Sequence, residues 1–254
     1  MKTAGIYIHI PFCAVKCMYC DFYSVTERES TIPQFVKAIS WEIENCLIDV
    51  SDWEFDTIFI GGGTPSLLKA SHIDTILSCL NKKYNLTNVK EFTIEANPGE
   101  APKDRLKDFN NMGINRISIG VQSFQPQLLK FLIRAHNKEQ IFETYNNIRS
   151  SGFENVNCDL IYSIPNQTWK MWEQDLKTII KMEPEHISAY TLTVEKGTEL
   201  FSMVYNNKIS MPSDEKESNW FLKTHDILPI NGYQPYEISN FSKAGFECRH
   251  NLHY

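Results

Sequence analysis

Three cysteines lie close together near the start of the chain, Cys13, Cys17 and Cys20, with the spacing Cx3Cx2C. Thiolates grouped on one loop can hold a single cuboidal iron–sulfur cluster, and three ligands leave its fourth iron open for chemistry. One alternative is structural zinc, which in closed sites takes four ligands, commonly as two separated pairs. No second pair exists here, so zinc would have to recruit His9 or a distant cysteine. The other alternative is that the three are unrelated core thiols.

The remaining four of the seven cysteines are scattered at Cys46, Cys79, Cys158 and Cys248. A disulfide scaffold is short and dense in cysteine, and this chain is neither. The scattered four stand in apolar or helical surroundings. We therefore expect them to be inert thiols that are buried or partly buried.

Glycine and polar residues stand at the ends of several apolar runs. The segment Gly61-Gly62-Gly63-Thr64 is glycine-rich, and glycine lets backbone groups approach a ligand closely. Three further apolar runs are each interrupted at the C-terminal end by a polar side chain: Glu95, Gln122 and Asp159. Taken singly, each is explained by an ordinary hydrogen bond at the surface. Taken together, convergent polar groups of this kind orient a small ligand in a pocket.

Alternating strands and helices must position these residues. Apolar alternation with period two predicts strands at residues 5–10, 57–60, 91–95, 116–121, 155–161 and 186–193. Apolar spacings of three and four predict helices at residues 34–48, 72–82, 103–110, 138–150 and 168–181. Gly113 and Gly152 follow two of these helices as C-terminal stop signals, and Ser213 is a plausible N-cap of a further helix.

Six strand-then-helix units with short connections predict the α/β class with a parallel sheet, either open and doubly wound or closed toward a barrel. Such architectures place their sites at the C-terminal ends of the strands. The cysteines, the glycines and the polar residues all follow predicted strands. We therefore expect them to meet at one mouth of the sheet.

Composition excludes several function classes. The 254 residues carry a net charge of −6, with 42% hydrophobic and 22% charged residues, as in ordinary soluble proteins. The acidic balance gives no broad basic surface for nucleic acid, so no nucleic-acid partner is expected. No apolar run reaches the roughly 18–20 residues of a membrane span, and the N-terminus has no signal-peptide pattern. The expected location is the cytoplasm.

The segments around the three cysteines carry a family resemblance. Tyr7-Ile-His-Ile-Pro-Phe-Cys13, running into Cys20-Asp-Phe22-Tyr-Ser, resembles the start of a radical SAM protein. More narrowly, it resembles the group that contains oxygen-independent coproporphyrinogen III oxidase (HemN) and the heme chaperone HemW. The resemblance implies a partial TIM barrel of the (β/α)6 type. It also implies a [4Fe-4S] cluster whose open iron binds the amino and carboxylate groups of S-adenosylmethionine, which one electron cleaves to methionine and a 5′-deoxyadenosyl radical.

The resemblance also assigns contacts to S-adenosylmethionine. Matching positions for the family's glycine motif, its polar strand ends, one arginine and one tyrosine are Tyr7, Gly62, Gly63, Thr64, Glu95, Gln122, Arg134 and Asp159. The arginine lies in Leu132-Ile-Arg-Ala-His-Asn137, which departs from the Leu-Gly-Arg-x-His form of the HemW group. Arg134 could instead be a solvated charge on a helix.

Three features favour HemW over HemN within this resemblance. HemN carries a fourth cysteine where this chain has Phe22, and a longer segment before the cluster where this chain has twelve residues. The third feature is His250-Asn251-Leu-His-Tyr254, which matches an HNxxY motif linked with heme binding. Imidazole and phenolate are both able to ligate heme iron, so His250 and Tyr254 are heme candidates. The alternative for His250 is that it caps or packs against the sheet.

The resemblance thus implies a heme chaperone that binds heme and passes it to an acceptor protein, with no residue assigned as catalytic. It further implies an electron donor such as flavodoxin or ferredoxin, and peripheral membrane contact through the acceptor. The alternatives are a coproporphyrinogen oxidase, and a radical SAM enzyme acting on RNA or another substrate. We expect a core domain at residues 1–232 and the start of a C-terminal region at residues 233–254. HemW-like proteins continue beyond this point, so the chain is expected to be a fragment.

Overall fold

The computed structural model describes residues 2–254. Six parallel strands, hydrogen-bonded to one another in chain order, form the body of one sheet. They are β1 (Lys2–Ile10), β2 (Trp53–Gly62), β3 (Glu91–Ala96), β4 (Arg116–Gln122), β5 (Asn155–Tyr162) and β6 (His186–Thr191). All six predicted strands are therefore confirmed, with β2 six residues longer than its apolar alternation indicated.

Eight helices connect or follow these strands among the described residues. They are α1 (Ile32–Asn45), α2 (Ala70–Lys83), α3 (Lys103–Asn111), α4 (Pro126–Phe131), α5 (Lys138–Ser150), α6 (Trp169–Met182), α7 (Glu199–Tyr205) and α8 (Asp214–Ile230). The five predicted helices are confirmed, and Ser213 is the N-cap of α8, accepting a hydrogen bond from the Lys216 amide. Gly113 and Gly152 have φ values of +91° and +98°, the left-handed conformation that ends a helix.

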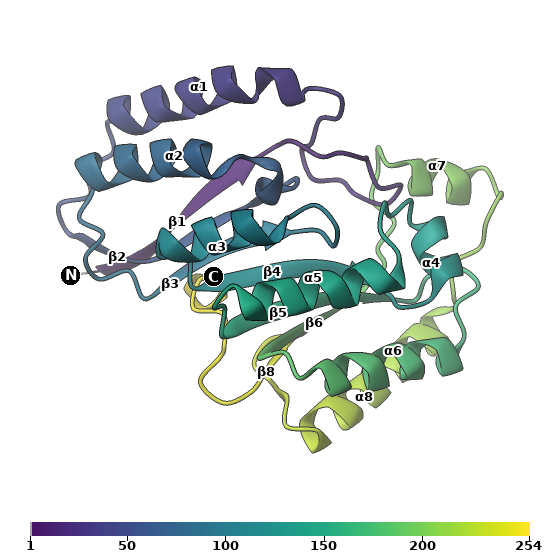
Figure 1. Ribbon diagram of the computed structural model, residues 1–254. Coiled ribbons are helices and arrows are strands. Elements are labelled where there is room, and N and C mark those ends of the chain that lie inside the picture. The colour runs from purple at the N-terminus through teal and green to yellow at the C-terminus, as the bar shows by residue number, and fades with distance from the viewer. Residues whose placement is uncertain (1) are drawn as a thin grey trace.

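The strand order decides between the two predicted sheet types. A doubly wound sheet reverses its strand order and carries helices on both faces. Here the order runs without reversal from β1 to β6, and the helices lie along one face (Figure 1). This is the arrangement of a partial barrel, whose inner face is left free for a site. The predicted (β/α)6 partial barrel is confirmed.

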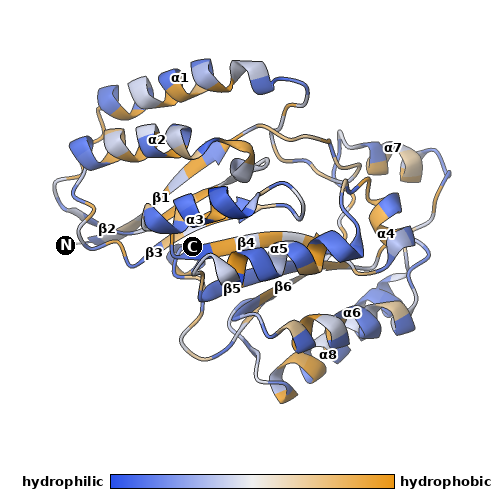
Figure 2. Ribbon diagram, in the orientation of Figure 1, coloured by the Kyte–Doolittle hydropathy of each residue, from blue (hydrophilic) through white to orange (hydrophobic). Residues whose placement is uncertain are grey.

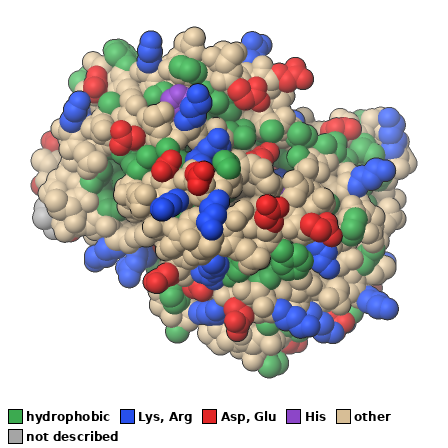
Figure 3. All heavy atoms as spheres, in the orientation of Figure 1, with side chains coloured by type: hydrophobic (Ala, Val, Ile, Leu, Met, Phe, Trp, Pro, Cys, Tyr) green, Lys and Arg blue, Asp and Glu red, His purple; other side chains and the backbone are tan. Residues whose placement is uncertain are grey.

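The outer face of the sheet packs against the helices through an apolar core. The hydrophobic residues of the helices lie mainly on the side toward the sheet and the hydrophilic ones on the outer side (Figure 2). On α6, for example, Trp172, Leu176 and Ile179 are fully buried, and each such side chain contributes about 1.5–3 kcal/mol by its removal from water. Lysines, arginines and acids are interspersed over the outer surface, without a large field of one sign on the face shown (Figure 3).

The chain after α8 extends the same sheet. β7 (Gln234–Pro235) and β8 (Asn240–Ser242) form antiparallel pairs, and β8 pairs with β6. The last residues then run back beneath the barrel, so that the C-terminus lies beside the first part of the sheet (Figure 1). The domain boundary expected at residues 232 and 233 stays a prediction. No helix within residues 2–254 is both long and apolar enough to cross a membrane.

Candidate functional site

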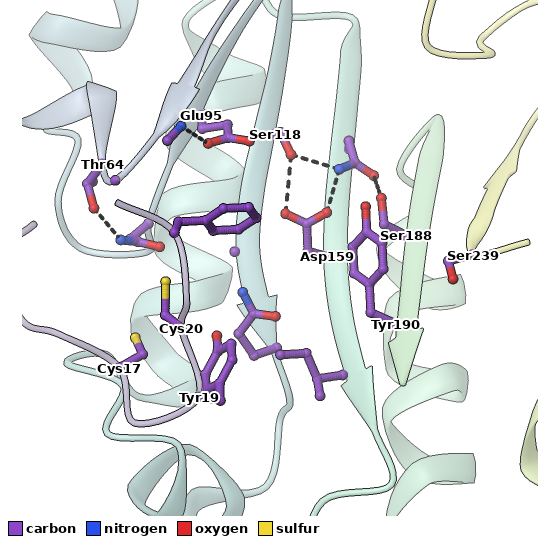
Figure 4. A pocket seen from close by; sticks show the side chains of 18 of the residues that line it. Cys17, Tyr19, Cys20, Thr64, Glu95, Ser118, Asp159, Ser188, Tyr190 and Ser239 are labelled. Atoms are coloured by element: carbon purple, nitrogen blue, oxygen red, sulfur yellow. Dashed lines mark hydrogen bonds between the residues drawn. The ribbon is translucent and has the colours of Figure 1, made fainter. Parts of the chain in front are cut away.

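The loop after β1 carries the three clustered cysteines and is closed at its base. Val25 donates its amide to the Pro11 carbonyl at 2.7 Å, and Cys13 donates its amide to the Val25 carbonyl at 3.0 Å. These two bonds fix the ends of the loop, so Cys13, Cys17 and Cys20 share one compact segment. All three thiols are half-buried, free of disulfides and part of the lining of a cavity. Figure 4 shows Cys17 and Cys20 on the loop beside it.

Two polar side chains donate to the cysteine sulfurs. The Thr64 hydroxyl donates to Cys13 Sγ at 3.7 Å, and Arg134 Nη1 donates to Cys17 Sγ at 3.3 Å. Hydrogen bonds of this kind stabilise thiolate over thiol, and thiolate is the form that binds iron. Two of the three sulfurs thus receive donors that favour the thiolate, which fits an iron–sulfur cluster.

The same loop gives no support to the zinc alternative. Within residues 2–254, no group of three His, Cys, Asp or Glu side chains converges on a point that could hold one metal ion. Zinc needs its sulfur ligands about 2.3 Å from a common centre. Cysteines that bind a cuboidal cluster each hold a different iron, so their sulfurs lie farther apart. No common centre of the first kind is present within residues 2–254.

The cavity behind this loop has a volume of about 580 Å³, within the range of small-molecule sites. It occupies the inner face of the barrel and contains most of the residues predicted from strand ends and from the resemblance. Those lining it are Cys13, Cys17, Cys20, Gly62, Gly63, Thr64, Glu95, Gln122, Arg134 and Asp159. The prediction that these residues meet at one site is confirmed. Their contact with S-adenosylmethionine stays a prediction.

Tyr7 is the exception, because it does not line this cavity. Its ring packs against Phe59, with centroids 6.1 Å apart, and its hydroxyl lies 3.1 Å from His9 Nδ1. His9 in turn bonds the Tyr23 carbonyl at 2.8 Å through Nε2. Tyr7 therefore reaches the cysteine loop through His9, and its assignment as a cofactor contact stays a prediction.

The glycine motif at the end of β2 is required by close packing. Gly62 has φ of +113°, and a Cβ there would lie 2.6 Å from a His9 ring atom. A Cβ on Gly63 would lie 2.6 Å from the Phe12 carbonyl oxygen and 3.0 Å from Cys13 Sγ. Only glycine lets β2 approach the cysteine loop this closely. The Gly62 amide donates to Glu95 Oε2 at 3.0 Å, which ties the motif to β3.

Two carboxyl groups face the cavity in the middle of the sheet. Burial, together with the nearby charge of Asp159, raises the pKa of Glu95 to about 7. Burial also raises the pKa of Asp159, whose oxygens accept hydrogen bonds from Ser118 at 3.3 Å and Asn157 at 2.8 Å. Figure 4 shows Asp159 held between these partners. The site can therefore hold protons near neutral pH.

We expect Glu95→Gln to become more stabilising as pH rises. Between the ordinary pKa of 4.5 and the raised value of about 7, the unfolded chain ionises Glu95 while the folded chain keeps it protonated. The free energy of unfolding of the wild-type protein is therefore highest below pH 4.5 with respect to this group, and it falls as pH rises from 4.5 to about 7. Because the carboxyl faces the cavity and is partly solvated, we expect a gain of only about 1–2 kcal/mol for the variant.

Urea unfolding of wild-type and variant protein without the cluster, at about pH 5 and about pH 8, measures this difference. Glu42→Gln, on the exposed face of α1, is the matched control. An equal stability change for Glu95→Gln at both pH values would contradict the assignment.

The loop after β4 holds Gln122 in an unusual backbone conformation. Gln122 has φ of +65°, in the left-handed region that is rare for residues other than glycine. The buried Asp175 of α6 holds the loop by accepting hydrogen bonds from Ser123 Oγ, the Phe124 amide at 3.1 Å and Gln125 Nε2 at 2.8 Å. This carboxylate therefore fixes the turn that directs Gln122 toward the cavity.

Arg134 lies between the cysteine loop and β4, so it is not a solvated charge on a helix. It donates to the Gly120 carbonyl at 2.9 Å and to Asn97 Oδ1, besides the bond to Cys17. Ile133 before it has φ of +55°, where the resembled motif has glycine. A β-branched residue in that conformation is strained by about 1–2 kcal/mol. Isoleucine in place of the motif's glycine thus adds strain to the turn, while Arg134 keeps its position beside Cys17.

The inner face of the barrel carries further polar residues that strand-end reasoning missed. Arg116 and Ser118 precede Gln122 on β4, and Asn157 precedes Asp159 on β5, at alternate positions. The overlooked signal was polar alternation along whole strands, as in Arg116-Ile-Ser-Ile-Gly-Val-Gln122. On β6, His186 uses both ring nitrogens, toward Asn157 Oδ1 at 2.6 Å and the Tyr236 hydroxyl at 2.7 Å. Its burial keeps the imidazole neutral by placing its pKa well below the ordinary value.

The C-terminal segment packs beneath the barrel. His250 is buried, with Nδ1 2.9 Å from the Thr57 hydroxyl and no partner for Nε2 within residues 2–254. Glu91 accepts hydrogen bonds from the amides of Arg249 and His250 at 2.9 and 3.1 Å, and one from Cys248 Sγ at 3.4 Å. The packing alternative for His250 therefore describes this conformation. Tyr254 is 93% exposed, with its ring centroid 6.0 Å from that of His250.

The scattered cysteines behave largely as expected. Cys79, Cys158 and Cys248 are buried, and burial raises the pKa of the Cys158 and Cys248 thiols, which makes them unreactive. Cys46 is half-buried, and a hydrogen bond with the Tyr84 hydroxyl lowers its pKa. All four thiols are free.

Comparison with known proteins gives independent evidence on the family of this chain. The model of the radical SAM superfamily matches residues 7–179. The chain is 36% identical to the heme chaperone HemW of Lactococcus lactis over 253 residues, covering 100% of this chain and 66% of that protein. It is 38% identical to HemW of Escherichia coli over 255 residues, again with 100% and 66% covered. The chain thus spans about two thirds of the length of these relatives.

A solved structure with the same fold is the coproporphyrinogen III oxidase HemN from Escherichia coli, described as a radical SAM enzyme. It superposes with a TM-score of 0.84 at 27% identity, over 97% of this chain and 56% of that one. The archaeal Elp3 of Methanocaldococcus infernus shares the fold at a TM-score of 0.58 and 17% identity.

Proposed function

Because the chain belongs to the radical SAM superfamily, and within it to the family of the heme chaperone HemW, we propose that it binds heme and passes it to an acceptor protein. The observation that carries the proposal is that similarity to HemW extends over the entire chain, including residues 233–254 with the HNxxY motif. Phe22 at the place of a fourth cysteine supports the same assignment.

The family implies a [4Fe-4S] cluster and S-adenosylmethionine. We assign the cluster to Cys13, Cys17 and Cys20. Thr64 and Arg134 donate hydrogen bonds to the sulfurs of Cys13 and Cys17. When bound, the cluster supplies one-electron reduction of S-adenosylmethionine, while the cavity residues bind that molecule and exclude water. The role of this site in a chaperone is to support or regulate heme transfer.

An electron donor such as flavodoxin or ferredoxin would act at the cysteine loop. Support comes from the loop's exposure, because Phe22 and Tyr23 are 65% and 74% exposed beside the cysteines. Lys16, on the same loop, adds a positive charge, with Nζ 2.9 Å from the Phe22 carbonyl and 2.6 Å from Ser24 Oγ. An apolar rim with a cation suits a donor that is acidic around its redox centre.

Heme binding is proposed at the C-terminal segment. His250 is 5% exposed and held by Thr57, and the Tyr254 ring lies beside it with the two ring centroids 6.0 Å apart. Coordination by His250 therefore requires the segment to leave its contacts with Thr57 and Glu91. Tyr254→Phe removes a single hydroxyl and leaves these contacts in place, so Tyr254 is the residue to test first.

Heme titrated into the full-length protein is expected to shift the Soret band away from that of free heme. Tyr254→Phe removes the phenolate ligand and is expected to weaken binding about tenfold, because one coordinate bond is lost. Tyr205→Phe, another exposed tyrosine on α7, is the matched control and is expected to leave the titration unchanged. A Soret band identical to that of free heme in the wild-type protein would remove the chaperone proposal.

The alternative is a coproporphyrinogen oxidase, favoured by one observation: the close superposition on HemN together with a cavity lined by the cluster cysteines. An anaerobic assay of the reconstituted protein with coproporphyrinogen III, S-adenosylmethionine and a reductant decides it. Formation of protoporphyrinogen IX would establish the oxidase. Its absence, with heme binding present, would leave the chaperone alone.

A further inference from the structure

Arg116 opens β4 with its side chain inside the barrel. The residue is 2% exposed and lines the cavity, yet its guanidinium forms no hydrogen bond or ion pair with any other group of residues 2–254. The buried Nε has no partner. A buried charge is costly unless it is paired and hydrogen-bonded. We therefore expect this guanidinium to bind a group that residues 2–254 do not supply.

The neighbouring strands contribute unpaired polar atoms at the same level. Arg116 pairs in register with Thr93 of β3 and with Asn155 of β5. Thr93 Oγ1 and Asn155 Oδ1 are both buried without a hydrogen-bond partner. Buried polar groups are satisfied in nearly all proteins, so a cluster of orphans on adjacent strands marks a place where a ligand or ordered water completes the structure.

The nearby carboxyl groups are engaged elsewhere. Asp159 is held by Ser118 and Asn157, and Glu95 by the Gly62 amide. Glu91 accepts its hydrogen bonds from the C-terminal segment. Burial raises the pKa of both Glu95 and Asp159, and the charge of Arg116 opposes that rise. Arg116 thus acts on them through space, without a direct bond to either.

Arg116 also lies apart from the cysteine end of the cavity. It begins β4 and Gln122 ends it, which at about 3.3 Å per residue separates their backbones by roughly 20 Å. The other cations lining the cavity, Lys16 and Arg134, lie at the cysteine loop. His186 is neutral. Arg116 is therefore the cation at the inner end.

We infer that Arg116 anchors a carboxylate group of a second ligand, bound at the inner end of the cavity beyond S-adenosylmethionine. A guanidinium presents a planar fork that matches a carboxylate with two parallel hydrogen bonds. A carboxylate fits better than a phosphate, because Arg116 is the single cation at this end of the described cavity and offsets one negative charge, not the two of a phosphate dianion. The carboxylate of S-adenosylmethionine is expected at the cluster, so it does not supply this group. The inference does not depend on heme binding.

The test observes the arginine directly. Protein labelled with 15N-arginine, reconstituted with its cluster and saturated with S-adenosylmethionine, is titrated with propionate while the Nε–Hε NMR signal of Arg116 is followed. The absence of that signal in Arg116→Lys assigns it. We expect propionate to shift the signal saturably, and propionamide, which has the same shape without the charge, to leave it unmoved.

Ligand-observed saturation transfer on propionate supplies the comparison between variants. We expect Arg116→Gln to bind propionate at least tenfold more weakly than wild type, and Arg116→Lys to retain part of the binding. Arg28→Gln, an exposed arginine before α1, is expected to bind as wild type. Equal binding of propionamide, an unmoved Arg116 signal, or displacement of propionate by S-adenosylmethionine would each overturn the inference. The wild-type titration decides the matter even where Arg116→Gln fails to fold.

Discussion

Cys17→Ala is expected to abolish stable cluster binding, whereas Cys79→Ala leaves it nearly intact. Cys17 lies on the loop that lines the cavity and receives a hydrogen bond from Arg134. Two remaining thiolates cannot hold a cuboidal cluster, because two of its irons would then lack a protein ligand. Cys79 is buried in α2 within the helical layer, where its Sγ lies 3.8 Å from Glu44 Oε1. Its loss removes one small buried group at a cost of about 1 kcal/mol.

Iron and acid-labile sulfide, measured after anaerobic reconstitution, provide the readout. Wild type and Cys79→Ala should each hold about four of both per chain, and Cys17→Ala well under one. EPR of the reduced protein with and without S-adenosylmethionine adds a second test, since binding at the open iron changes the cluster signal. Equal loss of iron in the two variants would refute the ligand assignment. Zinc in place of iron would refute the cluster itself.

The second large effect is expected for Arg134→Leu. This arginine joins three parts of the site, through Cys17 of the cluster loop, the carbonyl of Gly120 on β4 and Asn97 after β3. Leucine fills a similar volume but leaves these acceptors unpaired. Arg134 also lines the cavity and is a predicted contact of S-adenosylmethionine. Losing one hydrogen bond from a charged group to that ligand costs about 1.5–3 kcal/mol, so we expect the affinity for S-adenosylmethionine to fall tenfold to hundredfold.

Equilibrium binding of S-adenosylmethionine to the reconstituted variants measures the change, with iron content checked in the same samples. Arg28→Gln again serves as the control on an exposed arginine. Unchanged affinity in Arg134→Leu, with full iron content, would mean that Arg134 supports only the loop. Loss of iron together with affinity would assign its main role to the thiolate of Cys17.

Much of the fold was predictable because strand and helix periods are local. The helix at 138–150 has the same bounds in the structure as in the prediction, and it begins at a capping box formed by Asn137 and Gln140. The two short strands β7 and β8 were not predicted, because two or three residues carry no recognisable period. β8 pairs with β6 and β7 with β8, so both depend on the rest of the sheet.

The site was predictable to the extent that its residues stand at strand ends. Parallel strands bring their C-terminal ends to one edge, so strand periodicity is enough to group Glu95, Gln122 and Asp159. Arg116 and His186 were missed because they begin their strands, where the same rule predicts no site. Tyr7 was assigned by resemblance, and in the structure it reaches the cysteine loop only through His9.

The sequence alone predicted a shared cluster for Cys13, Cys17 and Cys20, because they are close enough along the chain to bind one cluster in any fold that leaves the loop intact. It also determined the parallel sheet, through periods that each segment carries by itself. Only the tertiary structure decided what the inner face encloses. Which side chains on strands far apart in the chain are paired, and which, like Arg116, are left without a partner, depends on how the sheet curls. That curvature depends on all six strands together and cannot be predicted from the sequence of any one of them.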